Sequence, residues 1–213
     1  MFTGIIEEIG TVTHVESGKE WIKLTISAAR VMEDIHLGDS MAINGICLTV
    51  TSFTESSFTV DIMPETVRAT SLYGIAKNML VNIERAMHAN GRFGGHFVSG
   101  HVDGVGEIIR KEKQANAIYY VIRMLPSLTE QCIHKGSITI DGTSLTIFHI
   151  QEGEITISLI PHTVSHTILG AKGVGKKVNI EIDMIGKYIR SALCREEKKS
   201  TITSSFLEEH GFC

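Results

Sequence analysis

The chain has 213 residues, 43% hydrophobic and 21% charged, which is typical of a globular protein and excludes a disordered or fibrous one. Its formal net charge of −4 leaves no basic excess for sequence-independent nucleic-acid binding. No apolar run approaches the roughly 20 residues that span a bilayer, and the start, MFTGIIEEIG, does not resemble a secretory signal. We therefore expect a cytoplasmic protein with neither a membrane nor a nucleic-acid partner.

The cysteines and histidines do not predict a metal site. The four cysteines lie far apart and form no CxxC pair, which disfavours tetrahedral zinc and, in a cytoplasmic chain, a disulfide framework. His96 and His101 are five residues apart in GGHFVSGHV, so on a strand they would face opposite sides of the sheet. We expect no bound metal and free thiols.

Most of the chain is an internal duplication. Three blocks recur at an offset of 97 residues: 40–51 with 137–148, 62–72 with 159–169, and 81–84 with 178–181. Fourteen of their 27 paired positions are identical, whereas chance gives roughly one match in fifteen. Residues 3–12 match residues 99–108 more loosely, at an offset of 96. We expect two similar domains, residues 1–96 and 97–182, and an unrepeated tail, residues 183–213.

Each repeat is predicted to consist mostly of strands. The segment Ile22–Ile26 alternates apolar and polar residues, as a half-buried strand does. Asn44-Gly45 and Asp141-Gly142 are equivalent tight-turn dipeptides, and Pro64 and Pro161 suit the start of a short helix or turn. With about six short strands per repeat, a closed antiparallel barrel is favoured over an open sheet with exposed edges. The predicted fold is all-β, with two tandem barrels and a C-terminal helix.

The tail carries the helical signals. Apolar residues at helical spacing form one stripe: Ile185, Tyr188, Ile189, Ala192 and Leu193. Further on, the segment Ser205–Glu208 fits a capping box for a last short helix that Gly211 would end. Two arrangements of the stripe stay open, packing on the chain's own barrel or against a partner chain.

Eight segments, in order and at consistent spacing, resemble the riboflavin synthase family: MFTGIIEEIGTV, NGICLTVT, MPETVRATSL, VNIERA, GGHFVSGHVDGVG, KGSITIDGTSLT, LIPHTVSHTILG and VNIEIDMIGKYI. The resemblance extends over essentially the full chain. It implies two six-stranded Greek-key barrels plus a C-terminal helix, assembled as a homotrimer. It also implies an active site between the N-terminal barrel of one subunit and the C-terminal barrel of its neighbour.

The reaction implied by this resemblance is a dismutation. Two molecules of 6,7-dimethyl-8-ribityllumazine exchange a four-carbon unit and give riboflavin and 5-amino-6-ribitylaminouracil, without a metal, nucleotide or redox cofactor. A duplicated fold suits this chemistry, because holding two reactants in line can lower a barrier by roughly 7–11 kcal/mol. In some bacteria such trimers lie inside a lumazine synthase shell, which makes lumazine synthase a candidate partner.

By resemblance, each repeat contributes one substrate pocket. The first is expected to be lined by Gly4, Ile5 and Ile6, by Cys47, Leu48 and Thr49, and by Asp61, Ile62, Met63, Pro64, Glu65 and Thr66. The second is expected to be lined by Gly100, His101 and Val102, by Ser144, Leu145 and Thr146, and by Ser158, Leu159, Ile160, Pro161, His162 and Thr163. Lys135 matches a family position that reaches substrate across the subunit contact. Alternatively, these residues simply close barrel ends and turns.

The candidate catalytic residues stand where the repeats differ. Cys47 corresponds to Ser144, and Ile5 to His101. A dismutation needs such asymmetry, since one lumazine gives the four-carbon unit and the other accepts it. His101 is the candidate proton shuttle for the C7 methyl group, because the unperturbed pKa of imidazole lies near 6.5. Cys47, Ser144 or a bound water could supply the nucleophile, and Cys47 could equally be a small buried apolar residue.

Two other functions compete with the enzyme. A non-catalytic lumazine- or flavin-binding relative would have lost the motifs of one pocket, whereas both PxT and both GxxLT segments are intact here. A flavin-dependent reductase would need a following nucleotide-binding domain with a Gly-rich phosphate turn. The candidate turn, residues 170–175, lies inside the second repeat. The sequence therefore favours the enzyme.

Overall fold

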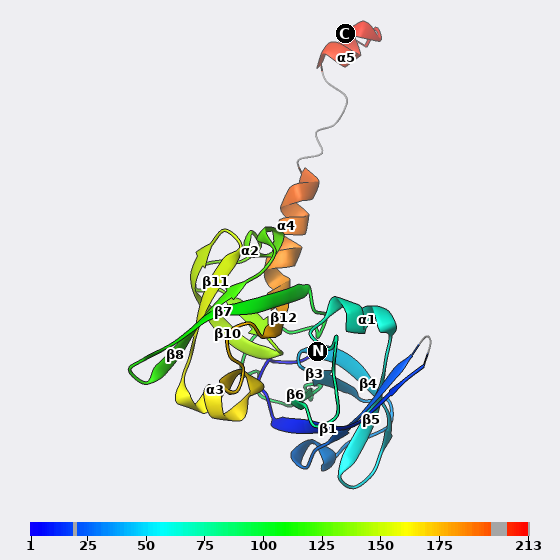
Figure 1. Ribbon diagram of the computed structural model, residues 1–213. Helices are drawn as coiled ribbons and strands as arrows, with labels where there is room; N and C mark the ends of the chain where they lie inside the picture. Colours follow the sequence, from blue (N-terminus) through cyan, green and yellow to red (C-terminus); the bar gives the residue numbers. More distant parts are fainter. Residues whose placement is uncertain (19–20, 197–203, 213) are drawn as a thin grey trace.

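Two closed β-barrels account for most of the chain (Figure 1). The computed structural model describes residues 1–18, 21–196 and 204–212. Around each ring, strands neighbour one another in the order β1-β2-β5-β4-β3-β6 in barrel 1 and β7-β8-β11-β10-β9-β12 in barrel 2. The fifth strand of each barrel lies beside the second, as in a Greek key. The predicted fold class, two tandem antiparallel barrels with a C-terminal helix, is confirmed.

The elements of the two repeats correspond one to one along most of their length. Barrel 1 consists of β1 (Glu8–Ser17), β2 (Ile22–Ser27), β3 (Ser40–Ile43), β4 (Ile46–Phe53), β5 (Ser57–Ile62) and β6 (Leu80–Arg85), with a 3₁₀ helix at Arg30–Met32 and α1 (Pro64–Ala69). Barrel 2 consists of β7 (Gly104–Gln114), β8 (Ala117–Arg123), β9 (Ser137–Ile140), β10 (Thr143–Gln151), β11 (Glu154–Leu159) and β12 (Lys177–Ile182), with α2 (Pro126–Thr129), α3 (Pro161–His166) and a 3₁₀ helix at Ile168–Gly170.

Alternation along the strands gives each barrel a buried inner side and an outer side. In β4, for example, Ile46, Leu48 and Val50 are buried, whereas Thr49 between them is exposed. The inward side chains of each barrel form a separate apolar cluster. Each repeat therefore has its own core, and its outer side is free to carry polar groups.

The tight turns predicted at Asn44-Gly45 and Asp141-Gly142 join β3 to β4 and β9 to β10. All four residues have positive φ, between 47° and 80°, as the two-residue hairpin turn requires. The turns also meet each other. A Cβ atom on Gly45 would lie 2.7 Å from the backbone nitrogen of Gly142, and the reverse distance is the same. Only glycine allows the barrels to approach this closely.

Two buried asparagines join the barrels symmetrically. The side-chain amide of Asn82 donates to the carbonyl of Asp141 at 2.9 Å, and that of Asn179 donates to the carbonyl of Asn44 at 2.8 Å. Each side-chain oxygen also accepts a backbone N–H from the other repeat at 2.6–2.8 Å. These asparagines belong to the repeated VNIE motif, so its repetition reflects an interface with approximate twofold symmetry.

The helix α4 (Met184–Glu196) projects away from both barrels (Figure 1). Its polar side is tied to barrel 2, because Lys187 contacts Asp103 at 2.6 Å and Arg190 contacts Glu130 at 3.7 Å. The predicted apolar stripe is exposed in the single chain, and Tyr188 is 71% exposed. A short helix α5 (Ser204–Glu209) follows. None of the described helices is long and apolar enough to cross a membrane.

Candidate active site

The segments at the start of each repeat cross over to the opposite barrel. The carbonyl of Gly4 accepts the backbone N–H of Ser144 at 2.7 Å, and the carbonyl of Gly100 accepts that of Cys47 at 2.8 Å. The resemblance groups Gly4 with Cys47 and Gly100 with Ser144, whereas these backbone bonds pair Gly4 with Ser144 and Gly100 with Cys47. A repeat offset identifies equivalent positions but not which copy makes a contact between two copies.

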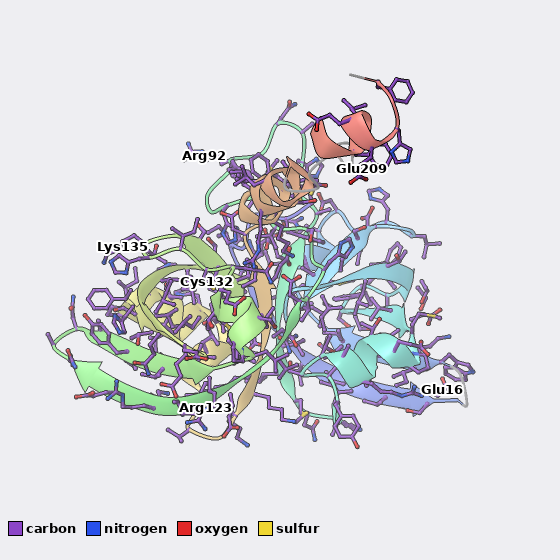
Figure 2. The ribbon with its side chains drawn as sticks, turned by 90° about the horizontal axis from the view of Figure 1, so that it is seen from above. Glu16, Arg92, Arg123, Cys132, Lys135 and Glu209 are labelled. Carbon is purple, nitrogen blue, oxygen red and sulfur yellow. The ribbon has the colours of Figure 1, made fainter. Side chains whose placement is uncertain are left out.

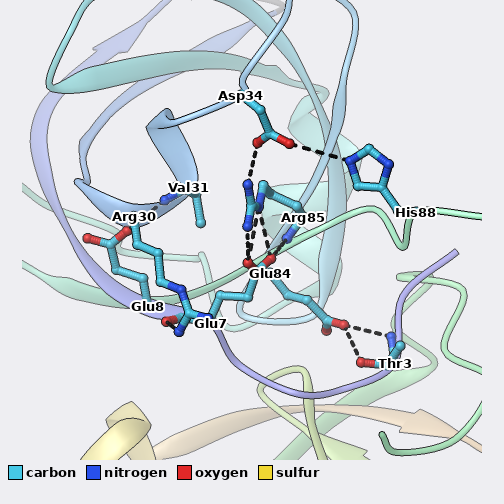
Figure 3. A network of polar contacts seen from close by, with 9 residues as sticks. All are labelled: Thr3, Glu7, Glu8, Arg30, Val31, Asp34, Glu84, Arg85 and His88. Atoms are coloured by element: carbon cyan, nitrogen blue, oxygen red, sulfur yellow. Dashed lines mark hydrogen bonds and ion pairs between the residues drawn. The ribbon is translucent and has the colours of Figure 1, made fainter. Parts of the chain in front are cut away.

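A buried glutamate holds each crossing segment. Glu84 accepts hydrogen bonds from the N–H and hydroxyl of Thr3 at 2.7 Å (Figure 3) and, from outside that view, from the N–H of Gly4 at 3.0 Å. Glu181 accepts the three equivalent bonds from Ser99 and the residue after it, at 2.6–3.1 Å. Burial raises the pKa of the Glu84 carboxyl, while the bonds from Thr3 and Gly4 act in the opposite direction. Both segments are thus fixed at three points.

The expected ligand residues divide between the inner and outer sides of the barrels. Three have side chains enclosed in the barrel cores: Leu48, Ile62 and Leu159. A fourth, Leu145, packs against the core of barrel 2. The outer side of barrel 1 carries Cys47, Thr49 and Asp61, and that of barrel 2 carries Ser144, Thr146 and Ser158. We call these two surfaces the outer face of barrel 1 and the outer face of barrel 2.

Each outer face ends at a short helix that begins with proline. Pro64 opens α1 and Pro161 opens α3, as predicted. The residues just before them, Met63 and Ile160, are 65% and 59% exposed. The residues just after include the exposed Glu65 and His162 and the half-buried Thr66 and Thr163. Apolar side chains beside a few polar groups suit a flat heterocycle with a hydroxylated chain.

His96, for which the sequence suggests no role beyond a disfavoured metal site, lies against the outer face of barrel 2. Its Nδ1 lies 2.7 Å from the Oγ of Ser144. The side chain is 9% exposed, and burial lowers the pKa of the imidazole, while the charge of Asp183 acts in the opposite direction. A neutral imidazole at this distance can accept the hydroxyl proton and activate the serine oxygen. The pair therefore has the geometry of a nucleophile and its base.

The glycine before His96 explains how the histidine reaches this position. A Cβ atom on Gly95 would lie 2.0 Å from the carbonyl oxygen of Thr3 and 2.9 Å from the Cβ of Ser144. His96 stands at the junction of the two repeats, where offsets of 96 and 97 give it no partner in the other repeat, so comparing the repeats does not identify it. The adjacent Gly94-Gly95 was the available sequence signal of a close approach.

Cys47 and His101 lie on the barrel 1 side of the crossing. The Cys47 thiol is free and half-buried, and it packs against a small buried cluster that includes Phe2 and Val98. His101 is exposed, and its backbone N–H donates to the Oγ of Ser99 at 3.2 Å. Its side chain lines a cleft of about 410 Å³ together with Val102 and residues of α4. This cleft is large enough to admit part of a substrate.

A second cleft, of about 340 Å³, lies beside Ile5 and is lined by Arg85. The Arg85 guanidinium contacts both carboxylate oxygens of Glu7 at 2.5–3.2 Å and also bonds Asp34 (Figure 3). These contacts raise the pKa of Arg85, and the Arg85 bond lowers the pKa of Asp34. Because two carboxylates already bind the guanidinium, the network supports the N-terminal segment, with Ile6 half-buried at its end.

Lys135 lies on the side of barrel 2 that faces away from barrel 1 (Figure 2). It is exposed, and its backbone N–H donates to the carbonyl of Ile147 at 3.0 Å. Cys132, three residues earlier, is half-buried, and burial raises its pKa to about 11, so it remains a thiol at neutral pH. The residues that the structure describes contain no cluster of three or more His, Cys, Asp or Glu arranged to hold a metal ion.

Both repeats match one protein family. The lumazine binding domain matches residues 3–86 and, a second time, residues 99–183. Together with the two barrels and their equivalent outer faces, this defines a tandem lumazine-binding barrel protein.

Full-length relatives narrow this class. The chain is 60% identical to riboflavin synthase of Bacillus subtilis (strain 168) and 49% identical to that of Actinobacillus pleuropneumoniae, in both cases over all of both chains. It is 44% identical to riboflavin synthase of Schizosaccharomyces pombe over 88% of this chain and 91% of that one. The chain belongs to the riboflavin synthase family.

Solved structures share the tandem-barrel fold. LumP complexed with 6,7-dimethyl-8-(1'-D-ribityl) lumazine matches with a TM-score of 0.77 at 23% identity, and LumP complexed with riboflavin with a TM-score of 0.78 at 24% identity. Each match covers 85% of this chain and 99% of the other. At this identity the likeness extends to the fold and not to individual contacts.

Proposed function

We propose that this protein catalyses the dismutation of 6,7-dimethyl-8-ribityllumazine. Two molecules of the lumazine give riboflavin and 5-amino-6-ribitylaminouracil by transfer of a four-carbon unit. The 60% identity to a riboflavin synthase over the whole of both chains carries the proposal. All atoms of the two lumazines appear in the two products, so the reaction needs no external oxidant, reductant or cofactor.

The two outer faces each bind one lumazine. The apolar residues at the ends of β5 and β11 contact the flat ring, and backbone groups of the crossing segments bond its pyrimidinedione edge. Hydroxyl and carboxylate groups, such as those of Glu65, Thr66 and Thr163, bond the ribityl chain. Leu48, Ile62 and Leu159, whose side chains are enclosed in the cores, contribute only their backbone groups.

The two outer faces carry different groups, and each face performs a different step of the reaction. His101, on the barrel 1 side, removes the acidic proton from the C7 methyl group of one lumazine. The resulting carbanion attacks the second lumazine, which has been activated by reversible addition of a nucleophile at C7; the nucleophile leaves again and recovers its proton before the products are released. Ser144 supplies or orients that nucleophile while His96 accepts its proton, a role supported by the 2.7 Å contact between them. Cys47 lies on the outer face of barrel 1.

A homotrimer brings unlike faces together. The outer face of barrel 1 in one subunit meets that of barrel 2 in the next, which is a head-to-tail contact that three copies can close. The apolar stripe on α4 supports this assembly, since Ile185, Ile189 and Leu193 are 51–60% exposed in the single chain. Lys135 extends from barrel 2 toward the substrate of the neighbouring subunit.

Deleting residues 183–213 tests the assembly. We expect monomers with much reduced turnover, because each site needs two chains, while the barrels stay folded on their separate cores. Analytical ultracentrifugation and riboflavin formation would be measured together. A truncated protein that still sediments as a trimer would show that α4 is not the assembly element.

The division into residues 1–96, 97–182 and 183–213 has its own test. Residues 1–96 contain a complete barrel with its own apolar core, so this fragment should fold and bind the lumazine. It should not form riboflavin, since it lacks His101, Ser144 and Lys135. Appreciable turnover by the fragment would show that those residues are dispensable.

We further propose that the enzyme acts in the cytoplasm and that lumazine synthase, which provides the substrate, is a candidate partner. Membership of a biosynthetic family supports the first point. Co-sedimentation of the two purified proteins tests the second, and separate sedimentation at micromolar concentration would argue against a stable complex.

Turnover of the lumazine alone decides the main proposal. Incubating purified protein with 6,7-dimethyl-8-ribityllumazine should give riboflavin and the aminouracil in equal amounts, with no added cofactor. Tight lumazine binding without product would instead identify a non-catalytic lumazine-binding protein. Absorbance and fluorescence distinguish these two results directly.

A further inference from the structure

An aromatic pair holds the side chain of Lys135. The Nζ atom lies over the ring of Phe148, 4.3 Å from its centroid. The Phe148 ring meets that of Tyr119 edge to face, with 5.5 Å between centroids. Phe148 follows Thr146 by two residues in β10, and Tyr119 pairs with Ser158 of β11. The pair therefore continues the outer face of barrel 2.

The backbone at Lys135 is of the kind that favours glycine. Lys135 has a φ of 63°, and its repeat partner Gly38 has a φ of 87°. Their N–H groups make the same bond, to Ile147 at 3.0 Å and to Val50 at 2.9 Å. A left-handed backbone costs a lysine more than a glycine, so this lysine stands where the fold alone would favour glycine, which points to a function.

Barrel 1 has different residues at each of these positions. Phe148 corresponds to Thr51, and Tyr119, through the strand register, to Lys23. Lys23 forms an exposed ion pair with Asp61 at 3.8 Å. The cation on an aromatic pair thus belongs to barrel 2, on the side that faces away from barrel 1 (Figure 2).

We propose that Phe148 and Tyr119 are positioning residues that hold the Lys135 ammonium ready to donate a hydrogen bond to an oxygen of the bound lumazine. The inference rests on the proposed function, because it takes the lumazine as the ligand. A free lysine samples many rotamers and loses that freedom on binding, whereas a ring face that already attracts the ammonium reduces the loss. Phe148 and Tyr119 act through the lysine and need not touch the substrate.

A double-mutant cycle on lumazine binding tests this role. The dissociation constant of 6,7-dimethyl-8-ribityllumazine would be measured by its fluorescence for the full-length wild type, Phe148→Leu, Lys135→Met and the double variant. Phe148→Leu should weaken binding about two- to fivefold, as expected for an exposed cation–π contact. It should have no effect in the Lys135→Met background, because the ring then has no ammonium to hold. Equal weakening in both backgrounds would overturn the proposal.

Three controls keep the result specific. Phe148→Trp preserves the ring face and should bind the lumazine as the wild type does. Phe53→Leu removes a phenylalanine of barrel 1 with matched exposure, 44% against 46%, and should leave binding unchanged. Tyr119→Leu should show the same dependence on Lys135 with a smaller effect, which provides a second cycle if Phe148→Leu does not fold. Loss of binding in Phe148→Trp equal to that in Phe148→Leu would count against the proposal.

The binding assay is independent of turnover, so it can refute the positioning role of Phe148 and Tyr119 without refuting the proposed enzyme activity, and the reverse. A protein that binds the lumazine with the expected coupling but forms no riboflavin would refute the proposed function and support the positioning role. A protein that forms riboflavin without coupling between Phe148 and Lys135 would do the reverse. In the active enzyme, Phe148→Leu should raise KM more than it lowers kcat, since the contact is already made in the bound ground state.

Discussion

Asn82 of barrel 1 and Asn179 of barrel 2 make the same bonds across the centre of the molecule, at nearly the same distances. On the outer faces, by contrast, Cys47 stands where the other repeat has Ser144, and Gly38 stands where it has Lys135. The groups that join the barrels have stayed alike, whereas several groups directed outward have diverged.

The contrast has a physical origin. Each crossing segment is held between the two barrels, by a glutamate of its own barrel and a backbone N–H of the other. The buried donors and acceptors of that interface are costly to leave unpaired. An outer face carries no such constraint. A reaction in which two identical molecules play different parts can therefore use the symmetry of the fold for binding and the asymmetry of the faces for chemistry.

The largest effect on turnover is expected from changes to His96 and Ser144, the pair on the outer face of barrel 2. His96→Gln should lower kcat about 10²-fold or more, as removal of a general base does. Ser144→Ala should do the same, and the double variant should be little worse than either, because the two residues act as a unit. Steady-state riboflavin formation measures this, with lumazine binding as the check on folding. Additive losses would show that the pair does not act together.

Barrel 1 offers the matched control. Cys47→Ser gives barrel 1 the residue that barrel 2 has, and it should retain substantial activity. His101→Gln should slow solvent exchange of the C7 methyl protons, since His101 is assigned to that proton, whereas His96→Gln should leave the exchange intact. NMR in deuterated buffer follows the exchange without turnover. Unimpaired exchange in a folded, lumazine-binding His101→Gln variant would remove His101 from proton transfer.

The symmetric contacts of Asn82 and Asn179 predict equal losses of stability when either residue is replaced. Asn82→Ala and Asn179→Ala each leave buried backbone groups of the opposite repeat without partners, which costs about 2–3 kcal/mol of unfolding free energy. Because the contacts are equivalent, the two losses should agree within about 0.5 kcal/mol. Urea unfolding followed by circular dichroism gives both values. A loss confined to one variant would show that the interface is not energetically symmetric.

Much of the fold could be predicted because its determinants are local and repeated. The period-two pattern, the Asn44-Gly45 and Asp141-Gly142 turns and the helix-starting prolines all depend on neighbours in the chain. The crossing of Gly4 to Ser144 could not be predicted in this way, since either copy of a repeat satisfies the same local pattern. The role of His96 could not be predicted for a related reason. Its role depends on a serine 48 residues away, and no repeat partner drew attention to it.

The buried imidazole of His96 also predicts that the unfolding free energy depends on pH, and the first repeat has no equivalent of this histidine. Burial lowers the pKa of His96 in the folded protein, so below about pH 6.5 the unfolded chain binds a proton that the folded chain resists. Unfolding free energy should therefore fall on acidification below pH 6.5, by at most about 1.4 kcal/mol per pH unit for one proton. Above that pH the contribution is constant.

His96→Gln isolates this contribution. Burial raises the pKa of Glu84, so Glu84 binds a proton more readily in the folded chain than in the unfolded chain. Its contribution to the unfolding free energy therefore changes with pH in the opposite direction to that of His96. The difference between wild type and His96→Gln cancels Glu84 and the other titrating groups. Urea unfolding at pH 7.5 and 5.5 should show a smaller loss in the variant. Equal losses would mean that folding does not lower the pKa of His96.

The smallest effect is expected where barrel 2 carries a lysine on a backbone suited to glycine. Lys135→Gly relieves a left-handed strain of ~1–2 kcal/mol, offset by the greater freedom of glycine in the unfolded chain, ~0.5–1 kcal/mol. Stability should stay equal or rise by up to about 1.5 kcal/mol while lumazine binding weakens. The reverse change, Gly38→Lys, should cost about 1 kcal/mol and leave binding unaltered. A Cβ atom at Gly38 meets nothing within 4 Å, so this cost reports the backbone alone. Thermal unfolding of both variants, with lumazine binding measured alongside, tests the pair. A Gly38→Lys protein as stable as the wild type would show that the positive φ is not what separates the two barrels at this position.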